Sequence, residues 1–150
     1  MTFERTRDLT LVKTLFTIPH IYRQTSDDFS PAPEKWEPPE SSDITYVLVR
    51  DEKHLLGMFA LVPENAICWK LHPCLLRNAW GEKARDIGRA FIKWVWANTP
   101  CVRLVSAIPV SAEAALKLAR DSGLEQFGVN PKSIMKSGTL QDQVLLGVSK

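Results

Sequence analysis

The sequence has no strong charge of either sign and no long apolar run. Its 19 Lys and Arg against 17 Asp and Glu leave a formal net charge of +2, whereas a nucleic-acid partner normally requires a focused basic patch. No apolar run approaches the roughly 20 residues of a membrane span. The first residues also carry charge where a signal peptide needs an apolar core. We therefore expect no nucleic-acid surface, no membrane segment and no secretion by that route.

Cysteine is scarce and poorly spaced for ligands or bridges. Cys68, Cys74 and Cys101 make an odd count, without a CxxC pair or a histidine at ligand spacing. This pattern predicts three reduced thiols in a cytoplasmic protein and no metal site. The sequence also has no internal repeat and no recognisable Ser/His/Asp or Cys/His arrangement. With 150 residues, 45% of them hydrophobic, the chain is expected to fold as one domain spanning 1–150.

The secondary-structure signals that are present alternate between helix and strand. The predicted helices are 6–18, 81–98 and 111–122, and the predicted strands are 44–50, 55–62, 66–76, 102–108 and 143–148. Thr6 or Asp8 is expected to cap the first helix, and Pro19 to end or kink it. Ser111 is the predicted N-cap of the last helix, and Gly123 its left-handed C-terminal residue, after which we expect a final hairpin. This series predicts an α/β fold with helices on both faces of a mixed sheet.

A proline-rich segment at 30–42 separates the first helix from the strands. We interpret it as a surface loop pinned by Trp36, and the alternative is a proline-rich recognition peptide. The helix 81–98 carries a basic stripe of Arg85, Arg89 and Lys93, which we expect to be a solvated face. Trp96 lies next to this stripe. It is either buried under the proline-rich loop or an anchor for a partner, such as a second copy in a homodimer.

Two blocks of sequence carry a resemblance to a known family. The first is Leu71-His72-Pro73 followed by Asn78-Ala79-Trp80-Gly81-Glu82-Lys83-Ala84, and the second runs from Ile108-Pro109-Val110-Ser111 through Ser122-Gly123-Leu124-Glu125 to Val144-Leu145-Leu146. In order and spacing, residues 44–150 resemble the GNAT superfamily of N-acetyltransferases. The resemblance implies a GNAT fold, with a mixed, mostly antiparallel sheet and a splay between two central strands. More narrowly, the chain is similar to GNAT-like head assembly proteins of short-tailed phages.

The resemblance also implies a cleft for acetyl-CoA or CoA. Pantetheine would pair with the strand 69–74, and the diphosphate would lie on the backbone amides of 78–83, where a helix begins. The residues implied as cofactor contacts are Leu71, His72, Pro73, Asn78, Trp80, Gly81, Glu82, Lys83, Ala84 and Ala112. Only Gly81 fits the family's loop motif strictly, and Lys83 would add a direct charge. The alternative is a helix start whose Gly81 merely turns the chain.

Two positions depart from the family's pattern on the last helix. Ala119 occupies the place of the usual tyrosine acid, and Ala112 that of the usual asparagine. The candidate bases are Glu64 and His72, although a histidine beside a proline is also a common structural residue. Two hypotheses follow. In the first, a phage-encoded scaffold in the host cytoplasm contacts phage structural proteins during head assembly; in the second, the protein is an active acetyltransferase on an unknown amine.

Overall fold

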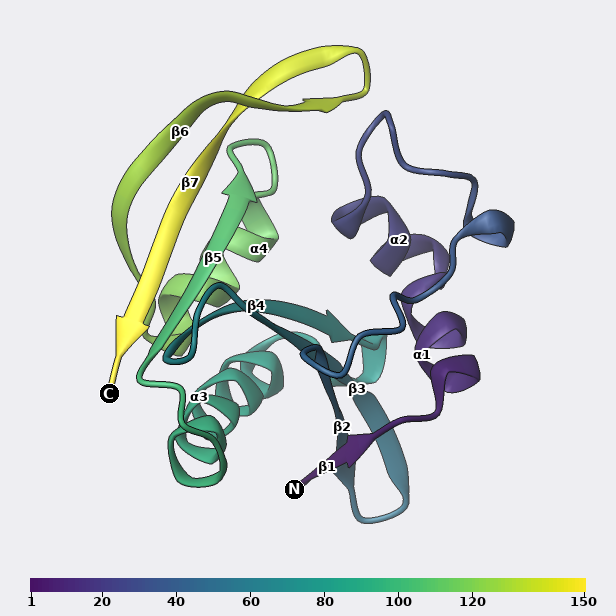
Figure 1. Ribbon diagram of the computed structural model, residues 1–150, viewed down its shortest axis with the longest axis vertical. Helices are drawn as coiled ribbons and strands as arrows, with labels where there is room; N and C mark the ends of the chain where they lie inside the picture. The colour runs from purple at the N-terminus through teal and green to yellow at the C-terminus, as the bar shows by residue number, and fades with distance from the viewer.

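The computed structural model describes all residues, 1–150. Its strands are β1 (Thr2–Thr6), β2 (Thr45–Asp51), β3 (His54–Pro63), β4 (Cys68–Leu75), β5 (Arg103–Pro109), β6 (Glu125–Lys136) and β7 (Thr139–Ser149). Its helices are α1 (Leu9–Phe16), α2 (Pro19–Thr25), α3 (Glu82–Asn98) and α4 (Glu113–Ser122), and short 3₁₀ turns lie at Pro33–Lys35 and Arg77–Ala79. The strands form one sheet of order β1-β2-β3-β4-β5-β7-β6 (Figure 1). Only the β4–β5 pair is parallel, so the predicted mixed, mostly antiparallel sheet is confirmed.

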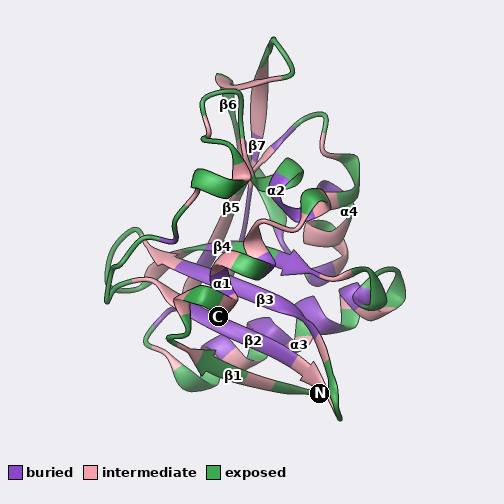
Figure 2. Cartoon of the chain, turned by 90° about the vertical axis from the view of Figure 1, so that its right-hand side faces the viewer, coloured by how far each residue is buried: buried purple, intermediate pink, exposed green.

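Two apolar cores lie on opposite faces of this sheet. The larger core is on the side of α3 and α4, where Phe91 is fully buried and stacks on Phe59 at a centroid distance of 3.8 Å. The smaller core joins Val12 of α1 and Ile21 of α2 to Met58 of β3. Figure 2 shows the buried strands between the two layers. The prediction of helices on both faces is confirmed. No helix combines the length and the apolar character that a membrane span requires.

The start of the chain differs from the prediction in two ways. Thr2–Thr6 is a strand paired with β2. The helix expected at 6–18 is the shorter α1, and a second helix that was not expected, α2, follows it from Pro19. Asp8 caps α1 by accepting the Leu11 N–H at 3.0 Å. Pro19 begins α2 instead of ending a helix, because the first helical position needs no N–H and suits the fixed φ of proline.

The proline-rich segment is a surface loop held by Trp36, as one interpretation proposed. The Trp36 ring stacks on Phe16 of α1, with 4.3 Å between ring centroids and 11° between planes. Tyr22 of α2 also donates its hydroxyl to the Pro31 carbonyl. Trp96 does not lie under this loop. It is half-buried and packs against the larger core.

The last helix ends as predicted but does not begin as predicted. Gly123 is left-handed, with φ 109°, and the Leu124 N–H returns to the Ala119 carbonyl. The predicted N-cap, Ser111, is wrong. The N-cap is Ala112, which offers no side-chain acceptor, and the Ser111 hydroxyl bonds instead to Gln141 at 2.6 Å. A hydrogen bond to the side chain of a β7 residue therefore takes the place of local capping at this serine.

The chain ends in a hairpin, as expected, but its strands are much longer than the strand predicted at 143–148. β6 and β7 meet in a two-residue turn at Ser137 and Gly138, both with positive φ (53° and 73°). The Asp28 carboxylate accepts both turn N–H groups at 2.7 Å. Because Asp28 follows α2, these two hydrogen bonds tie the hairpin tip to the loop after α2, and Figure 1 shows the two segments close together.

Candidate functional site

The parallel strands β4 and β5 pair for only three residues and then separate. Cys68 to Lys70 pairs with Arg103 to Val105. Beyond this point β4 stays paired with β3 as far as Leu75, while β5 stays paired with β7 as far as Pro109. The splay implied by the family resemblance is therefore present, and it widens toward the C-terminal ends of both strands.

The backbone groups on the β4 edge that faces the splay are only partly hydrogen-bonded. The Leu76 N–H bonds to the Leu56 carbonyl of β3, and antiparallel pairs alternate, so Leu71, Pro73 and Leu75 direct their backbone groups away from β3. Pro73 has no N–H, which a central strand tolerates only where no neighbour needs it. The splay thus explains a proline inside β4, and it leaves the Pro73 carbonyl and the Leu75 N–H without a strand partner.

The splay opens beside the N-terminus of α3, where Gly81 is the N-cap. Gly81 has φ 76° and ψ −140°, no side chain caps the first turn, and a Cβ built on Gly81 would meet nothing within 4 Å. The Ala84 N–H donates to the Gly81 carbonyl at 3.1 Å. The amides of Glu82 and Lys83 remain at a helix terminus, where the backbone favours an anion.

Two polar side chains expected on the diphosphate are engaged elsewhere. Lys83 Nζ pairs with Asp51 at 2.7 Å, and this bond holds the pKa of the Asp51 carboxyl below its usual value. Asn78 Nδ2 donates to the Leu55 carbonyl at 3.2 Å. Both contacts tie the loop to the β2–β3 hairpin, so the expected direct charge from Lys83 is replaced by an ion pair.

Two basic side chains that the sequence reasoning missed lie at this end of the splay. Trp80 is half exposed; the Arg77 guanidinium lies 5.7 Å from its ring centre, and the His20 ring meets it edge-on at 5.3 Å. His20 and the Trp80 indole both lie 3.4 Å from the Leu75 carbonyl. Arg77 is a residue type that can open the family's loop motif, but it lies four residues before Gly81 where the motif needs three, so the motif's spacing pointed to Asn78 instead. His20 has no signal in sequence because folding brings α2 there.

The two candidate bases occupy different surroundings. His72 pairs with Ala60 and lies on the sheet face of α1 and α2, since Cys74 two residues on belongs to the smaller core. Solvent reaches His72, yet the protein around it keeps its pKa below the ordinary value, first through desolvation and then through the charge of Lys70. Glu64 lies beyond the end of β3 and binds Lys70 Nζ at 2.8 Å. The carboxylate of this second candidate base is therefore held in an ion pair.

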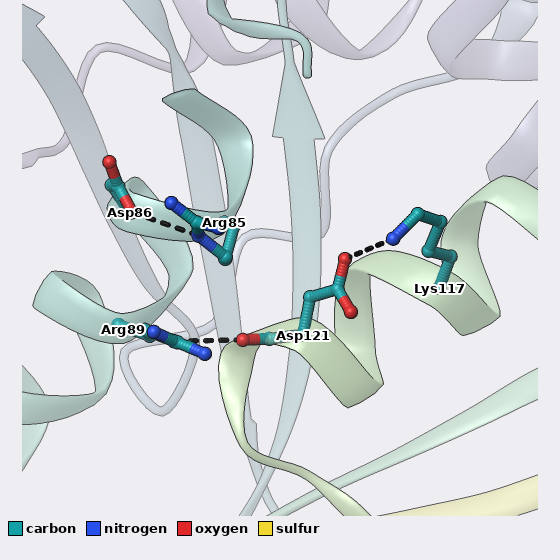
Figure 3. A network of polar contacts seen from close by, with 5 residues as sticks. All are labelled: Arg85, Asp86, Arg89, Lys117 and Asp121. Atoms are coloured by element: carbon teal, nitrogen blue, oxygen red, sulfur yellow. Dashed lines mark hydrogen bonds and ion pairs between the residues drawn. The ribbon is translucent and has the colours of Figure 1, made fainter. Parts of the chain in front are cut away.

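Helices α3 and α4 are locked together behind the splay. A Cβ at Gly88 would lie 2.1 Å from the Ser122 hydroxyl, so the helices approach closely there. The residues of Figure 3 lie beside this contact. Arg89 Nε donates to the Asp121 carbonyl at 2.8 Å, and Lys117 binds the Asp121 carboxylate at 2.5 Å. Part of the basic stripe of α3, expected to be solvated, therefore joins the two helices.

Ala119 and Ala112 bring no polar side chain to this region. Ala119 is half-buried and packs against the larger core, and Ala112 begins α4. Two surface cavities of about 290 and 360 Å³ lie beside α1 and the proline-rich loop. Neither cavity is lined by β4 or β5, so the splay, defined by strand pairing, is the candidate site.

The three thiols are free, and we expect them to differ in reactivity. Full burial raises the pKa of Cys74 to about 12, and burial also raises the pKa of Cys101, whereas Cys68 is only half-buried. Alkylation of the native protein in mildly alkaline buffer should modify Cys68 first and Cys74 only after unfolding, because the thiolate is the reactive form. Peptide mass mapping measures this order. An intramolecular disulfide in the unreduced mass would contradict it.

The fold is the GNAT fold that the resemblance implied, because it is shared with solved spermidine N-acetyltransferases. Spermidine N-acetyltransferase from Vibrio cholerae in complex with CoA and spermine matches with a TM-score of 0.76 and 16% identity, over 99% of this chain and 94% of that one. A dodecameric form of the same enzyme in an intermediate state matches with a TM-score of 0.74 and 17% identity, over 99% and 92%. No protein-family model and no curated protein matches the sequence. At these identities the likeness establishes the fold, and neither structure supports the narrower resemblance to phage head assembly proteins.

Proposed function

We propose that this protein is an acetyl-CoA-dependent N-acetyltransferase acting on a primary amine. The observation that carries the proposal is the splay after Lys70 and Val105, which exposes the edge of β4 directly beside the uncapped N-terminus of α3. The solved structures of similar fold are named as acetyltransferases, and this favours the enzyme over a scaffold role in head assembly. Spermidine, the substrate in their name, is the first acceptor to test.

The residues at the splay fit two parts of a CoA molecule, the diphosphate and the pantetheine. The N–H groups of Glu82 and Lys83 and the Arg77 guanidinium would hold the diphosphate. The Pro73 carbonyl and the Leu75 N–H would pair with pantetheine amides, as an added strand does. Bound acetyl-CoA would supply the activated thioester. Pro73 removes one donor from this edge, so we expect weaker binding than a complete edge would give.

His72 is the base in this proposal. Its lowered pKa keeps the imidazole neutral near pH 7, and it lies on the sheet face opposite α3, whose N-terminus would hold the diphosphate. An amine approaching over the α1 and α2 face would give its proton to His72 as it attacks the thioester carbon. A thiol has an ordinary pKa of about 8.5, so the sulfur leaves as a thiolate without an acid at Ala119.

A self-associating assembly is also proposed, on the edge strand β6. Phe127 is 54% exposed and Val129 46% exposed there, and an unpaired strand edge is a template for pairing with a second copy. The neighbouring enzyme is described as dodecameric. Light scattering at several protein concentrations measures the state, and a strictly monomeric protein would remove this part of the proposal.

Replacing Gly81 by valine is expected to abolish measurable acetyl-CoA binding while the fold persists. A β-branched residue resists φ 76°, at a cost of about 1–3 kcal/mol, and moves the amides that would hold the diphosphate. Gly123→Val is the matched control, because Gly123 also has positive φ and open space but lies at the far end of α4. Calorimetric titration with acetyl-CoA measures both variants. Unchanged affinity in Gly81→Val would show that the loop is misassigned, and no binding by the unaltered protein would overturn the proposed function.

A further inference from the structure

The point where β4 and β5 separate is marked by a serine hydroxyl. Lys70 and Val105 form the last parallel pair. At the next position Ser106 Oγ donates to the Leu71 carbonyl at 2.9 Å. Ser106 lies on the α3 and α4 side of β5, since Leu104 and Ile108, at alternate positions, both pack in the larger core. A side-chain donor therefore replaces the backbone N–H that would have continued the pairing.

The splay determines where the end of an inserted ligand would lie. A ligand anchored at Gly81 and paired with the edge of β4 runs from Leu75 toward Leu71, a path of about 13 Å at the usual rise per residue. It cannot run further, because below Leu71 the two strands are bonded to each other. The acyl end of such a ligand would thus meet the hydroxyl of Ser106.

We propose that Ser106 is a catalytic residue whose hydroxyl donates a hydrogen bond to the thioester carbonyl oxygen of acetyl-CoA. This inference rests on the proposed function. The neutral Leu71 carbonyl holds the hydroxyl in the free protein. An oxygen that gains negative charge during the reaction is a stronger acceptor than a neutral carbonyl, so the hydroxyl turns from Leu71 to it.

Transfer of the acetyl group to the amine needs no external acid or oxidant. The amine nitrogen bonds to the carbonyl carbon, and the C–O π electrons move to the oxygen, which Ser106 stabilises without giving up its proton. The carbonyl then re-forms, the C–S bond breaks, and sulfur leaves with the electron pair as a thiolate. The amine proton goes to His72 and from there to water.

His72 and Ser106 lie on opposite faces of the sheet. Leu71, whose carbonyl Ser106 contacts, is adjacent in sequence to His72, and successive β4 side chains point to opposite faces. His72 therefore acts from the α1 and α2 side, and Ser106 from the α3 and α4 side. A thioester lying between them would be attacked on one side and stabilised from the other.

The test compares Ser106→Ala with Ser106→Thr, which keeps the hydroxyl. Ser133→Ala is the matched control, because Ser133 Oγ donates to a backbone carbonyl in the same way, to Asn130 at 2.8 Å, but in the bulge of β6. We expect Ser106→Ala to lower kcat about 10²- to 10³-fold, as the loss of one oxyanion donor does. Ser106→Thr should retain most of the rate, and Ser133→Ala all of it.

The readout independent of turnover is the infrared carbonyl stretch of bound, ¹³C-labelled acetyl-CoA. It should move to higher frequency in Ser106→Ala, because a hydrogen bond to the thioester is lost, while the calorimetric affinity for CoA, which has no acetyl group, stays unchanged. If Ser106 only shapes the splay, CoA affinity falls and the stretch is unaltered, which would overturn the proposal. Binding of acetyl-CoA with an unaltered rate and stretch in Ser106→Ala overturns this inference alone, whereas no binding by the unaltered protein overturns the proposed function with it.

Discussion

Replacing His72 by asparagine is expected to lower kcat/KM for acetyl transfer about 10²- to 10⁴-fold, the usual contribution of a positioned base. Asparagine keeps a polar side chain of similar reach but cannot take the amine proton. His72 is solvent-accessible and outside both cores, so the fold should survive, and a thermal melt checks this. Glu64→Gln is the comparison variant. It removes the carboxylate that binds Lys70 and should leave the rate within the same order of magnitude.

The pH profile separates a base from a structural histidine. A base works only when neutral, so activity should rise with pH through the pKa of His72. That pKa lies below the ordinary 6.5, because desolvation and Lys70 both disfavour the imidazolium. The part of the rise that comes from His72 should therefore be complete at neutral pH in the unaltered protein. It should be absent in His72→Asn, where the ionisation of the acceptor amine alone shapes the profile. An identical profile in both proteins would assign the proton to another group.

The parts of the fold that could be predicted from sequence are those with a strong local signal. The α3 stripe of Ala84, Ile87, Phe91 and Val95 is buried as its helical spacing indicates. Gly123 ends α4 in the left-handed conformation that glycine adopts at low cost. The hairpin of β2 and β3 follows from two apolar runs around a polar turn. In each case the residues that carry the signal are neighbours in sequence, so local chemistry and tertiary packing agree.

The elements that were missed are defined by distant partners. β1 is short and polar, and it is a strand because Phe3 pairs with Val49. The N-terminal half of the β6–β7 hairpin is largely exposed and lacks the alternation that predicts a strand. Its far end is held by the contact between Asp28 and the turn at Ser137 and Gly138, more than 100 residues away. In both cases the two partners lie too far apart in the sequence for a local pattern to reveal the contact.

The candidate site divides in the same way. Gly81 lies at the start of α3 as its place before an amphipathic run predicts, and the splay follows the family pattern. The side chains of Asn78, Lys83 and Ser111 were misplaced, because each found a partner 23 to 32 residues away. Ser106 gave no signal at all in sequence, since a serine in an apolar strand becomes informative only when the neighbouring strand departs at that position.

Placing tyrosine at Ala119 tests whether departure of the thiolate limits the reaction. The resemblance to the GNAT superfamily implies that a tyrosine acid usually stands at this position. If its absence slows this protein, Ala119→Tyr should raise kcat up to about 10²-fold, the lower end of what a positioned acid contributes. The matched control is Ala119→Phe, which has the same bulk without the hydroxyl. Acetyl transfer to spermidine or another reactive amine, measured by thiol release, gives the rate of each.

The structure also indicates what this substitution costs. Ala119 is half-buried against the larger core, one turn before the close contact of Ser122 with Gly88. A ring there overpacks this region and should lower the free energy of unfolding by ~1–3 kcal/mol in both variants. A gain in rate for Tyr over Phe at equal stability would identify the missing acid as the limit. Equal rates would show that the thiolate leaves unaided, and the absence of transfer by all three folded proteins would favour the scaffold hypothesis over the enzyme.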